Sequence, residues 1–392
     1  MRDFQWISPT EFVFGHAAEE RIGAWASEHG FTRALVVYGR GHVERSGLLA
    51  RVLASLDASG IEHVEMGGVR PNPEVTSVRR GIELAREHGI DLIVPVGGGS
   101  TIDCSKAIAG GTLYDGDVWD FYQKPNPRAI ERAIPLAVVL TIPAAGSEGS
   151  NSSVISNDEL GLKSGLHSDL VRPRVAFMDP ELTLTLPAWQ TFSGITDMCA
   201  HIMERFFSAS EDVPVTDEIA LGLLRSIRAC ALRLLRDPSD YDARANIMWA
   251  STLAHNGLAG RGREEDWASH ALEHELSALH TDVTHGAGLA VMFPAWMRYV
   301  CDARPERFVR FGRELFGIVP TGDDLADAHA AIDRLQEFFV SMGMPRTLAD
   351  LGFVPDDVER MLPTLRQNKG DAFGSFKKLS IDDARQIYLS AF

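Results

Sequence analysis

The first half of the chain alternates runs rich in β-forming residues with stretches that carry apolar residues at helical spacing. The helical stretches lie at about residues 47–59 and 75–88, and each is followed by a glycine. Strand, helix and strand in this order predict right-handed βαβ units and therefore a parallel sheet. The predicted strands are Ala34–Tyr38, His63–Met66, Asp91–Val96 and Ile134–Leu140.

The pattern changes after Pro187. Strand signals are absent from the second half, and long amphipathic stretches punctuated by Pro and Gly take their place. We therefore expect an α/β domain over residues 1–187 and an all-α domain over residues 188–392. The predicted helices of the second domain lie at about residues 189–208, 215–236, 241–257, 266–279, 287–301, 305–316, 323–341, 355–366 and 381–390.

Composition and charge exclude several classes of protein. The chain has 392 residues, of which 45% are hydrophobic, and at about 150 residues per domain it should form two or three folded domains. Because the formal net charge of -16 repels phosphate backbones, we expect no nucleic-acid partner. A nicotinamide coenzyme is not excluded, since phosphate sites use local backbone N–H groups rather than net charge.

Cysteine usage and hydropathy favour a cytoplasmic location. The four cysteines lie far apart, and no pair has Cys-x-x-Cys spacing, which is typical of a reducing compartment. The opening sequence MRDFQWISPT lacks the apolar core of a signal peptide. The longest near-continuous apolar run, Ala133–Ala145, is too short to span a bilayer, so we expect no membrane segment.

A glycine-rich turn follows the predicted strand Asp91–Val96. Gly97, Gly98 and Gly99 let the backbone approach a ligand closely, and the helix predicted to begin near Ser100 offers free N–H groups to a phosphate. Asp103 lies in the first turn of that helix, where it can cap the helix or bind a ligand. The spacing is not Gly-x-Gly-x-x-Gly, so a tight turn without a ligand stays an open alternative.

Two further turns follow predicted strands. Gly39-Arg40-Gly41 carries an arginine where NAD-binding folds often carry an acidic group for the ribose, which favours NADP, although a solvated turn arginine is the alternative. The third turn runs from Thr141 to Glu148 and is rich in small residues. On one sheet edge, the three turns would line a common crevice.

Histidines cluster in the second domain. Asp197 and His201 are four residues apart on one predicted helix face, and His270 and His274 repeat this spacing on another. His280 and His285 follow. On one continuous helix His285 would lie about 22 Å from His270, so a loop or a new helix start has to bring it back to the same ion. Carboxylate and imidazole ligands from separate helices suit Zn²⁺, Fe²⁺ or Mn²⁺. A set of satisfied core histidines is the alternative.

The order of these motifs resembles the iron-containing (group III) alcohol dehydrogenases, and within them the NADP-dependent butanol dehydrogenases. The likeness covers nearly the whole chain, and many separate motifs carry it. They are Pro9-Thr10 with Phe14-Gly15, Gly39–Gly47, Val69–Pro73, Gly97–Ser100 with Asp103 and Lys106, Tyr114–Asp120, Gly146-Ser147-Glu148, Asp179–Thr183, Gly194–Asp197 with His201, His255-Asn256-Gly257, His274-Glu275-Leu276 and Thr284-His285-Gly286.

The resemblance implies a dehydroquinate-synthase-like fold and a metal-dependent enzyme that transfers hydride between NADP(H), or NAD(H), and a primary alcohol or aldehyde. It implies Fe²⁺ or Zn²⁺, and a homodimer, a state frequent in the family. The implied metal ligands are Asp197, His201, His270 and His285, and the implied proton relay is His274. The implied coenzyme contacts are Gly39, Arg40, Gly41, Gly98, Gly99, Ser100, Asp103, Thr141, Ser147 and Lys163.

Two departures from the family pattern concern the same sites. Ala145 stands where the family usually has Thr, which removes one hydroxyl contact to the coenzyme. The segment between His274 and His285 is one residue longer than usual, which makes His280 a competing ligand. Other functions compatible with the pattern are a polyol dehydrogenase or dehydroquinate-synthase-like enzyme of the same fold, and a non-catalytic module that binds metal and nucleotide. The full Asp/His/His/His set argues against the first, and His274 against the second.

Overall fold

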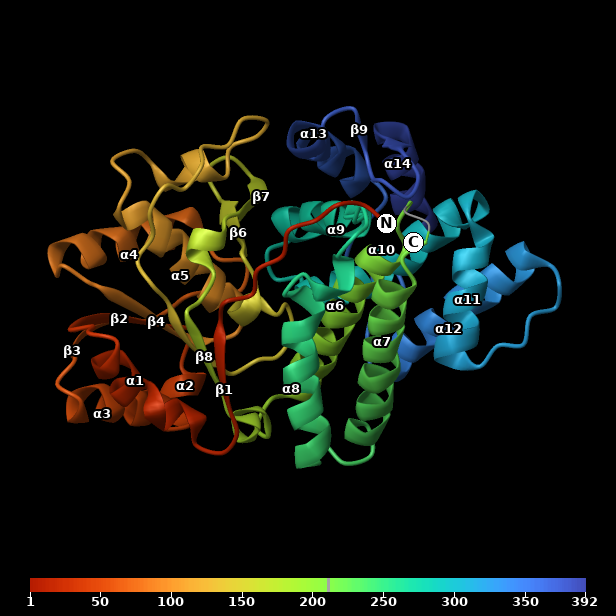
Figure 1. The fold of residues 1–392 in the computed structure, drawn as a ribbon. Coiled ribbons are helices and arrows are strands. Elements are labelled where there is room, and N and C mark those ends of the chain that lie inside the picture. The colour runs from red at the N-terminus through yellow and green to blue at the C-terminus, as the bar shows by residue number, and fades with distance from the viewer. Residues whose placement is uncertain (210–211) are drawn as a thin grey trace. The chain divides into compact units, whose positions relative to one another are not determined.

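The computed structural model describes residues 1–209 and 212–392, and the chain divides into two compact units. One unit is Ile7–Leu186, and the other combines Pro187–Phe392 with the N-terminal segment Met1–Trp6. The predicted fold class is confirmed, because the first unit is built on a parallel sheet and the second is dominated by helices (Figure 1). Where the chain is described, no helix combines the length and the apolar character needed to cross a bilayer.

A six-stranded parallel sheet forms the centre of the unit Ile7–Leu186. Its strands β4 and β5 are buried at every position, as expected for strands covered on both faces. The prediction missed the two strands at one side, which are only four residues long. The strands in spatial order are β1 (Glu11–Phe14), β8 (Val175–Met178), β5 (Ala137–Leu140), β4 (Leu92–Gly97), β2 (Arg33–Tyr38) and β3 (Glu62–Met66).

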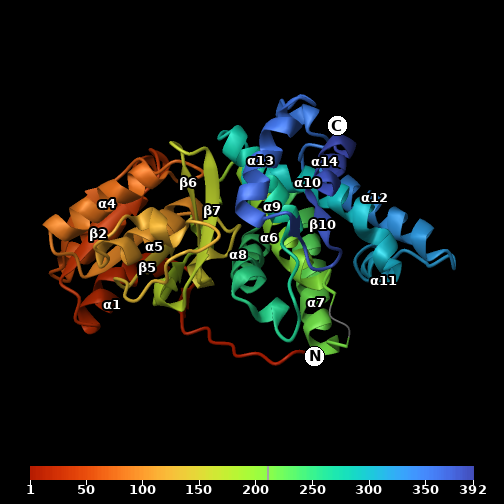
Figure 2. The ribbon, with the colours of Figure 1, turned by 90° about the horizontal axis from the view of Figure 1, so that it is seen from above.

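Helices cover both faces of this sheet. Figures 1 and 2 show α4 and α5 on one face, and Figure 1 shows α1 and α3 on the other. Successive side chains of β2 point to opposite faces of the sheet. Leu35 and Val37 pack in the core under α4 and α5, whereas Ala34 and Val36 pack in the core under α1 and α3. The helices are α1 (Ile22–Glu28), α2 (His42–Arg45), α3 (Leu48–Ala58), α4 (Val75–Glu87) and α5 (Gly99–Thr112).

An antiparallel hairpin follows the central strand β5 and was not predicted. It consists of β6 (Ser152–Asn157) and β7 (Leu162–His167), which pair along their full length. Serine, asparagine and glycine fill many of its positions, so no apolar run marks it in the sequence. Packing of β6 on α5 stabilises it instead. Short 3-10 segments connect these elements, at Ala18–Arg21, Val118–Phe121, Ser147–Gly149, Asp169–Val171 and Pro180–Thr183.

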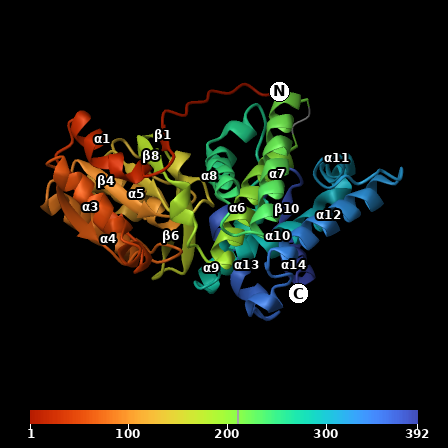
Figure 3. The ribbon, with the colours of Figure 1, turned by 90° about the horizontal axis from the view of Figure 1, so that it is seen from below.

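The other unit contains all nine predicted helices, with ends shifted by a few residues. Every residue from Thr191 to Phe206 of α6 is buried, because α6 packs against α7, α8 and α10 (Figure 3). The helices are α6 (Ala188–Phe206), α7 (Pro214–Leu234), α8 (Tyr241–His255), α9 (Ala268–Leu279), α10 (His285–Val300), α11 (Pro305–Phe316), α12 (Asp324–Ser341), α13 (Asp357–Lys369) and α14 (Ile381–Ser390).

One feature of this unit differs from the all-helical expectation. A small antiparallel ladder joins β9 (Ala372–Phe373) and β10 (Leu379–Ser380). Strands of two residues leave no alternating pattern that sequence reasoning can detect. The remaining 3-10 segments are Leu258–Gly260, Cys301–Ala303 and Ala349–Leu351.

Candidate functional site

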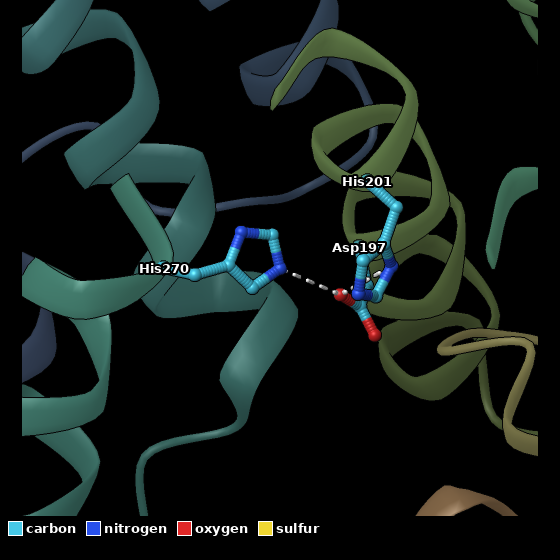
Figure 4. Close-up of side chains that lie close together, drawn as sticks. All are labelled: Asp197, His201 and His270. Atoms are coloured by element: carbon cyan, nitrogen blue, oxygen red, sulfur yellow. Dashed lines mark ion pairs between the residues drawn. The ribbon is translucent and has the colours of Figure 1, made fainter. Parts of the chain in front are cut away.

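The buried helix α6 carries a carboxylate and an imidazole one turn apart. Asp197 and His201 are both about 5% exposed, and the His201 Nδ1 lies 3.4 Å from the Asp197 Oδ1 (Figure 4). Both side chains share one helix face because residues four apart overlie one another. On a helix buried along almost its whole length, this face points into protein rather than into solvent.

Helix α9 brings a second imidazole to the same carboxylate. The His270 Nε2 lies 3.9 Å from the Asp197 Oδ1, and a dashed line in Figure 4 marks this pair. The other ring nitrogen of His270 is hydrogen-bonded to the buried Glu204 Oε1 at 2.9 Å, and the same oxygen accepts the His270 backbone N–H. Burial raises the pKa of Glu204 well above its usual value. When Glu204 is ionised, it holds a proton on Nδ1 and leaves the Nε2 lone pair facing Asp197.

The start of helix α10 adds a third imidazole. The His285 Nε2 lies 3.8 Å from the Asp197 Oδ1, and its Nδ1 is bonded to the buried Glu273. Gly286 makes this approach possible, because a Cβ at that position would lie 2.0 Å from the Ser193 carbonyl oxygen of α6. The spacing of the histidines predicted a loop or a new helix start at His285, and the structure has the second, with α10 beginning at His285.

The donor set fits a divalent metal ion. The ligand atoms of Asp197, His201 and His270 all lie within 4.8 Å of one another, and donors about 2.1 Å from one ion in a tetrahedron are about 3.4 Å apart. In the described part of the chain, the buried His201 Nδ1 and His270 Nε2 have no hydrogen-bond partner. Buried polar atoms are rarely left unsatisfied without a ligand. The orphaned nitrogens therefore suit an ion held by nitrogen and oxygen.

Burial favours the neutral form of His201 and His270. Desolvation lowers the pKa of His201 and of His270 well below the usual value, and the neighbouring histidines and Arg205 lower both further. Arg205 is itself buried, donates to the His201 carbonyl, and lies over the ring of Trp267 at 4.7 Å. Trp267 and His255 complete an aromatic wall beside His201, with ring centroids 5.9 and 4.2 Å away.

His274 and His280, the other two histidines of this region, lie in different surroundings. The half-buried ring of His274 is centred 5.5 Å from that of His285 and 6.3 Å from that of His270. His280 instead packs on Phe353 and faces Asp357, with its Nε2 3.7 Å from the carboxylate. The geometry thus brings His285 rather than His280 to Asp197, and it leaves His274 beside the cluster.

The three glycine-rich turns lie at one edge of the sheet. They follow β2, β4 and β5, which are adjacent and parallel, so their carboxyl ends meet there. Gly98 precedes α5, and a Cβ on it would lie 2.9 Å from the Ile142 Cβ; a Cβ on Gly99 would lie 3.3 Å from that of Ala145. The turns after β4 and β5 are therefore in direct contact. Helix α5 begins at Gly99, with Ser100 next, at this edge.

The remaining predicted coenzyme residues divide into exposed and internally bonded groups. Arg40 is exposed at the end of β2, between Gly39 and Gly41, and Gly41 has the left-handed φ of 61°. Thr141 begins the turn after β5 and donates its backbone N–H to the Gly97 carbonyl. The other three are hydrogen-bonded within the protein. Asp103 accepts the Ser147 hydroxyl and the Val154 N–H, and the Ser147 hydroxyl oxygen also accepts from Lys106. Lys163 donates to Asn72.

Sequence reasoning missed the carboxylates behind the histidines. Glu204 stands seven residues after Asp197 and shares its helix face, so the 3.6-residue period could have revealed it. Glu273 lies next to His274 in the sequence, but its bond to His285 crosses from α9 to α10, and no local pattern predicts it.

Two family models match almost the whole chain. The model described as iron-containing alcohol dehydrogenase matches residues 9–180, and the model described as the C-terminal part of the Fe-containing alcohol dehydrogenase family matches residues 191–392.

Individual proteins are similar over their full length. The NADH-dependent butanol dehydrogenase A of Clostridium acetobutylicum is 39% identical, with 100% of both chains covered. The NADPH-dependent aldehyde reductase YqhD of Escherichia coli is 34% identical, again with 100% of both covered. The crystal structure of NADH-dependent butanol dehydrogenase A from Thermotoga maritima superposes with a TM-score of 0.96 at 37% identity, over 100% of this chain and 99% of that one.

Proposed function

The chain belongs to the iron-containing alcohol dehydrogenase family, and we propose that it transfers hydride between NADP(H) and a primary alcohol or aldehyde at a bound ferrous ion. Family membership makes the chain an NAD(P)-dependent alcohol dehydrogenase or aldehyde reductase that depends on a metal. The choice of NADP, the choice of iron and the residues assigned to each step are the proposal.

The observation that carries the proposal is that one ring nitrogen each of His201, His270 and His285 lies 3.4 to 3.9 Å from the same oxygen of Asp197. We assign these four side chains as the metal ligands. A divalent ion held there would act as a Lewis acid towards the substrate oxygen, and a nicotinamide would supply or accept the hydride. The family description and the room that substrate needs beside four protein ligands support Fe²⁺ over a closed four-coordinate zinc site.

The protein side chains account for orientation and proton transfer. Glu204 and Glu273 keep the Nδ1 protons on His270 and His285, so that both Nε2 atoms face inward. Reduction of an aldehyde consumes one hydride and one proton, and oxidation of an alcohol releases both. We assign the proton to a ring nitrogen of His274, whose half-buried position beside His285 gives it access to water.

Arg40 supports NADP(H) as the coenzyme. Both NADH- and NADPH-dependent enzymes occur among the relatives, so the choice rests on the residues at the end of β2. A guanidinium exposed at this position pairs well with the 2′-phosphate that distinguishes NADP from NAD. We further propose a homodimer, as in the family, and a cytoplasmic location, which the four buried free cysteines support.

Oxidation of NADPH and of NADH by short aldehydes, with and without added Fe²⁺ or Zn²⁺, tests the function. We expect turnover that depends on the metal, is highest with Fe²⁺ and prefers NADPH. The variant Arg40→Asp should move the preference towards NADH by roughly tenfold or more, since it removes a charge-assisted phosphate contact. An unchanged NADPH/NADH ratio would remove Arg40 from the assignment, and metal-independent turnover would contradict the role of the four ligands.

A further inference from the structure

Lys106 is a fully buried ammonium in the sheet unit. It lies on α5, two turns after the glycine turn, and its side chain has no exposure to solvent. The Nζ atom lies within hydrogen-bond distance of five oxygens, all from one loop. They are Ser147 O at 2.7 Å, Ser147 Oγ at 2.8 Å, Ser150 O at 3.0 Å, Ser150 Oγ at 3.2 Å and Ser152 O at 2.8 Å.

Asp103 fastens the same loop from the same face of α5. Its Oδ1 accepts the Ser147 hydroxyl at 2.6 Å, and its Oδ2 accepts the Val154 backbone N–H at 2.9 Å. The Ser153 hydroxyl donates to the Asp103 carbonyl at 2.9 Å. An Asp and a Lys three residues apart on one helix therefore hold both ends of the segment 147–154, which connects the turn after β5 to the hairpin strand β6.

Keeping the ammonium of Lys106 out of water is unfavourable for the stability of the fold. Burial lowers the pKa of Lys106 to about 8, which reflects the penalty of keeping an ammonium out of water. An apolar residue would avoid that penalty but would leave the serine oxygens around it without their donor, and buried charges of this kind can serve to specify one conformation. The loop that Lys106 holds continues directly from Ala145, which meets the glycine turn after β4.

We propose that Lys106 is a positioning residue for the coenzyme, because it fastens the turn after β5 to α5 and thereby sets the spacing between the turns that hold the dinucleotide. The ammonium itself does not touch the coenzyme; it acts through the segment 147–152. This inference rests on the proposed nucleotide site. It adds to that site a single buried charge on which the geometry of two turns depends, whereas the metal cluster lies on other elements.

The variant Lys106→Met tests the proposal. We expect the Kd for NADPH, measured by fluorescence titration, and the KM for NADPH to rise by roughly 10- to 100-fold, since the oxygens around Nζ lose the three N–H donors of the ammonium. The kcat at saturating NADPH should change by less than about threefold, because coenzyme binding rather than the chemical step is affected. The metal content should stay the same.

Arg51→Met is the matched control. Arg51 on α3 pairs with the buried Glu19 at 2.8 Å, so its loss also strips a buried group in the sheet unit of its partner, on the face away from α5. It should lower the thermal midpoint without raising the Kd for NADPH. If Lys106→Met weakens NADPH binding no more than Arg51→Met at a comparable loss of thermal stability, Lys106 is merely structural and the proposal is overturned.

Ser150→Ala covers the case in which Lys106→Met does not fold. It removes one hydroxyl from the ammonium and leaves every predicted coenzyme contact in place. We expect a rise in the Kd for NADPH of roughly two- to fivefold with unchanged kcat; an unchanged Kd would overturn the proposal. Coenzyme binding by the unaltered enzyme distinguishes a failure of the proposed function from a failure of the positioning role. If the unaltered enzyme binds no nicotinamide coenzyme, the proposed function fails as well, whereas normal binding with an insensitive Lys106→Met variant refutes the positioning role alone.

Discussion

The two proposed ligand sites of this protein are built in different ways. At the sheet edge, glycine turns bring backbone groups together, and the charged side chains Asp103 and Lys106 are hydrogen-bonded within the protein. In the helical unit, three imidazoles lie close to one oxygen of Asp197, and the carboxylates of Glu204 and Glu273 are hydrogen-bonded to two of them. Substitutions that add atoms to the glycine turns should therefore weaken coenzyme binding, and substitutions that remove ligand atoms from the histidine cluster should weaken metal binding.

The largest effect is expected from His270→Ala. It removes a ligand atom and leaves Glu204 buried with one partner fewer, so we expect loss of bound metal and a fall in turnover of more than about 10³-fold. Metal content by mass spectrometry and NADPH binding by fluorescence should be measured on the same preparation. A variant that keeps metal and activity would refute the ligand assignment, and a variant that also loses NADPH binding would break the separation of the two sites.

His274→Ala should give the next largest effect. We assign His274 as a proton relay rather than a metal ligand, so the variant should keep its metal while its kcat falls by about 10²–10⁴-fold. The measurements are metal content and kcat over a range of pH, where loss of a relay changes the pH profile. Loss of metal from this variant would make His274 a ligand instead.

Glu204→Gln probes the carboxylate behind His270. Groups that orient a ligand typically account for about 10–100-fold in metal affinity, so we expect a weakening of that size, measured by competition with a chelator. Glu275→Gln is a matched control, because Glu275 is also a buried carboxylate, lies on α9, and accepts a hydrogen bond from Asn368. Equal metal affinity in the two variants would argue against an orienting role for Glu204.

Gly98→Ala should give the smallest effect and tests the other half of the comparison. The new Cβ would lie 2.9 Å from the Ile142 Cβ, so the turn after β5 has to shift and NADPH binding should weaken by roughly tenfold. Gly222→Ala on α7 is the control, since its Cβ would meet only the end of Arg225 at 3.9 Å. Metal content should be unchanged in both, and undiminished NADPH binding in Gly98→Ala would contradict the close approach of the backbone to the coenzyme.

Local patterns were most informative where an element is long or buried. The strands β2 and β4 follow from runs of β-forming residues, and the nine predicted helices found in the described part of the second unit follow from helical spacing, as does the i,i+4 pair Asp197 and His201. The strands β1 and β8 escaped prediction because their runs are only four residues long, and the hairpin β6–β7 escaped it because serine, asparagine and glycine fill many of its positions.

The sequence by itself determined which residues share a helix face, where the glycine turns fall and which chemistry the histidines and carboxylates can perform. Only the tertiary structure decided that His285 reaches Asp197 while His280 turns to Asp357, and that Asp103 is bonded to Ser147. The physical reason is that periodicity is a property of neighbouring residues, whereas these contacts depend on close approach between separate elements, such as Gly286 of α10 against the backbone of α6.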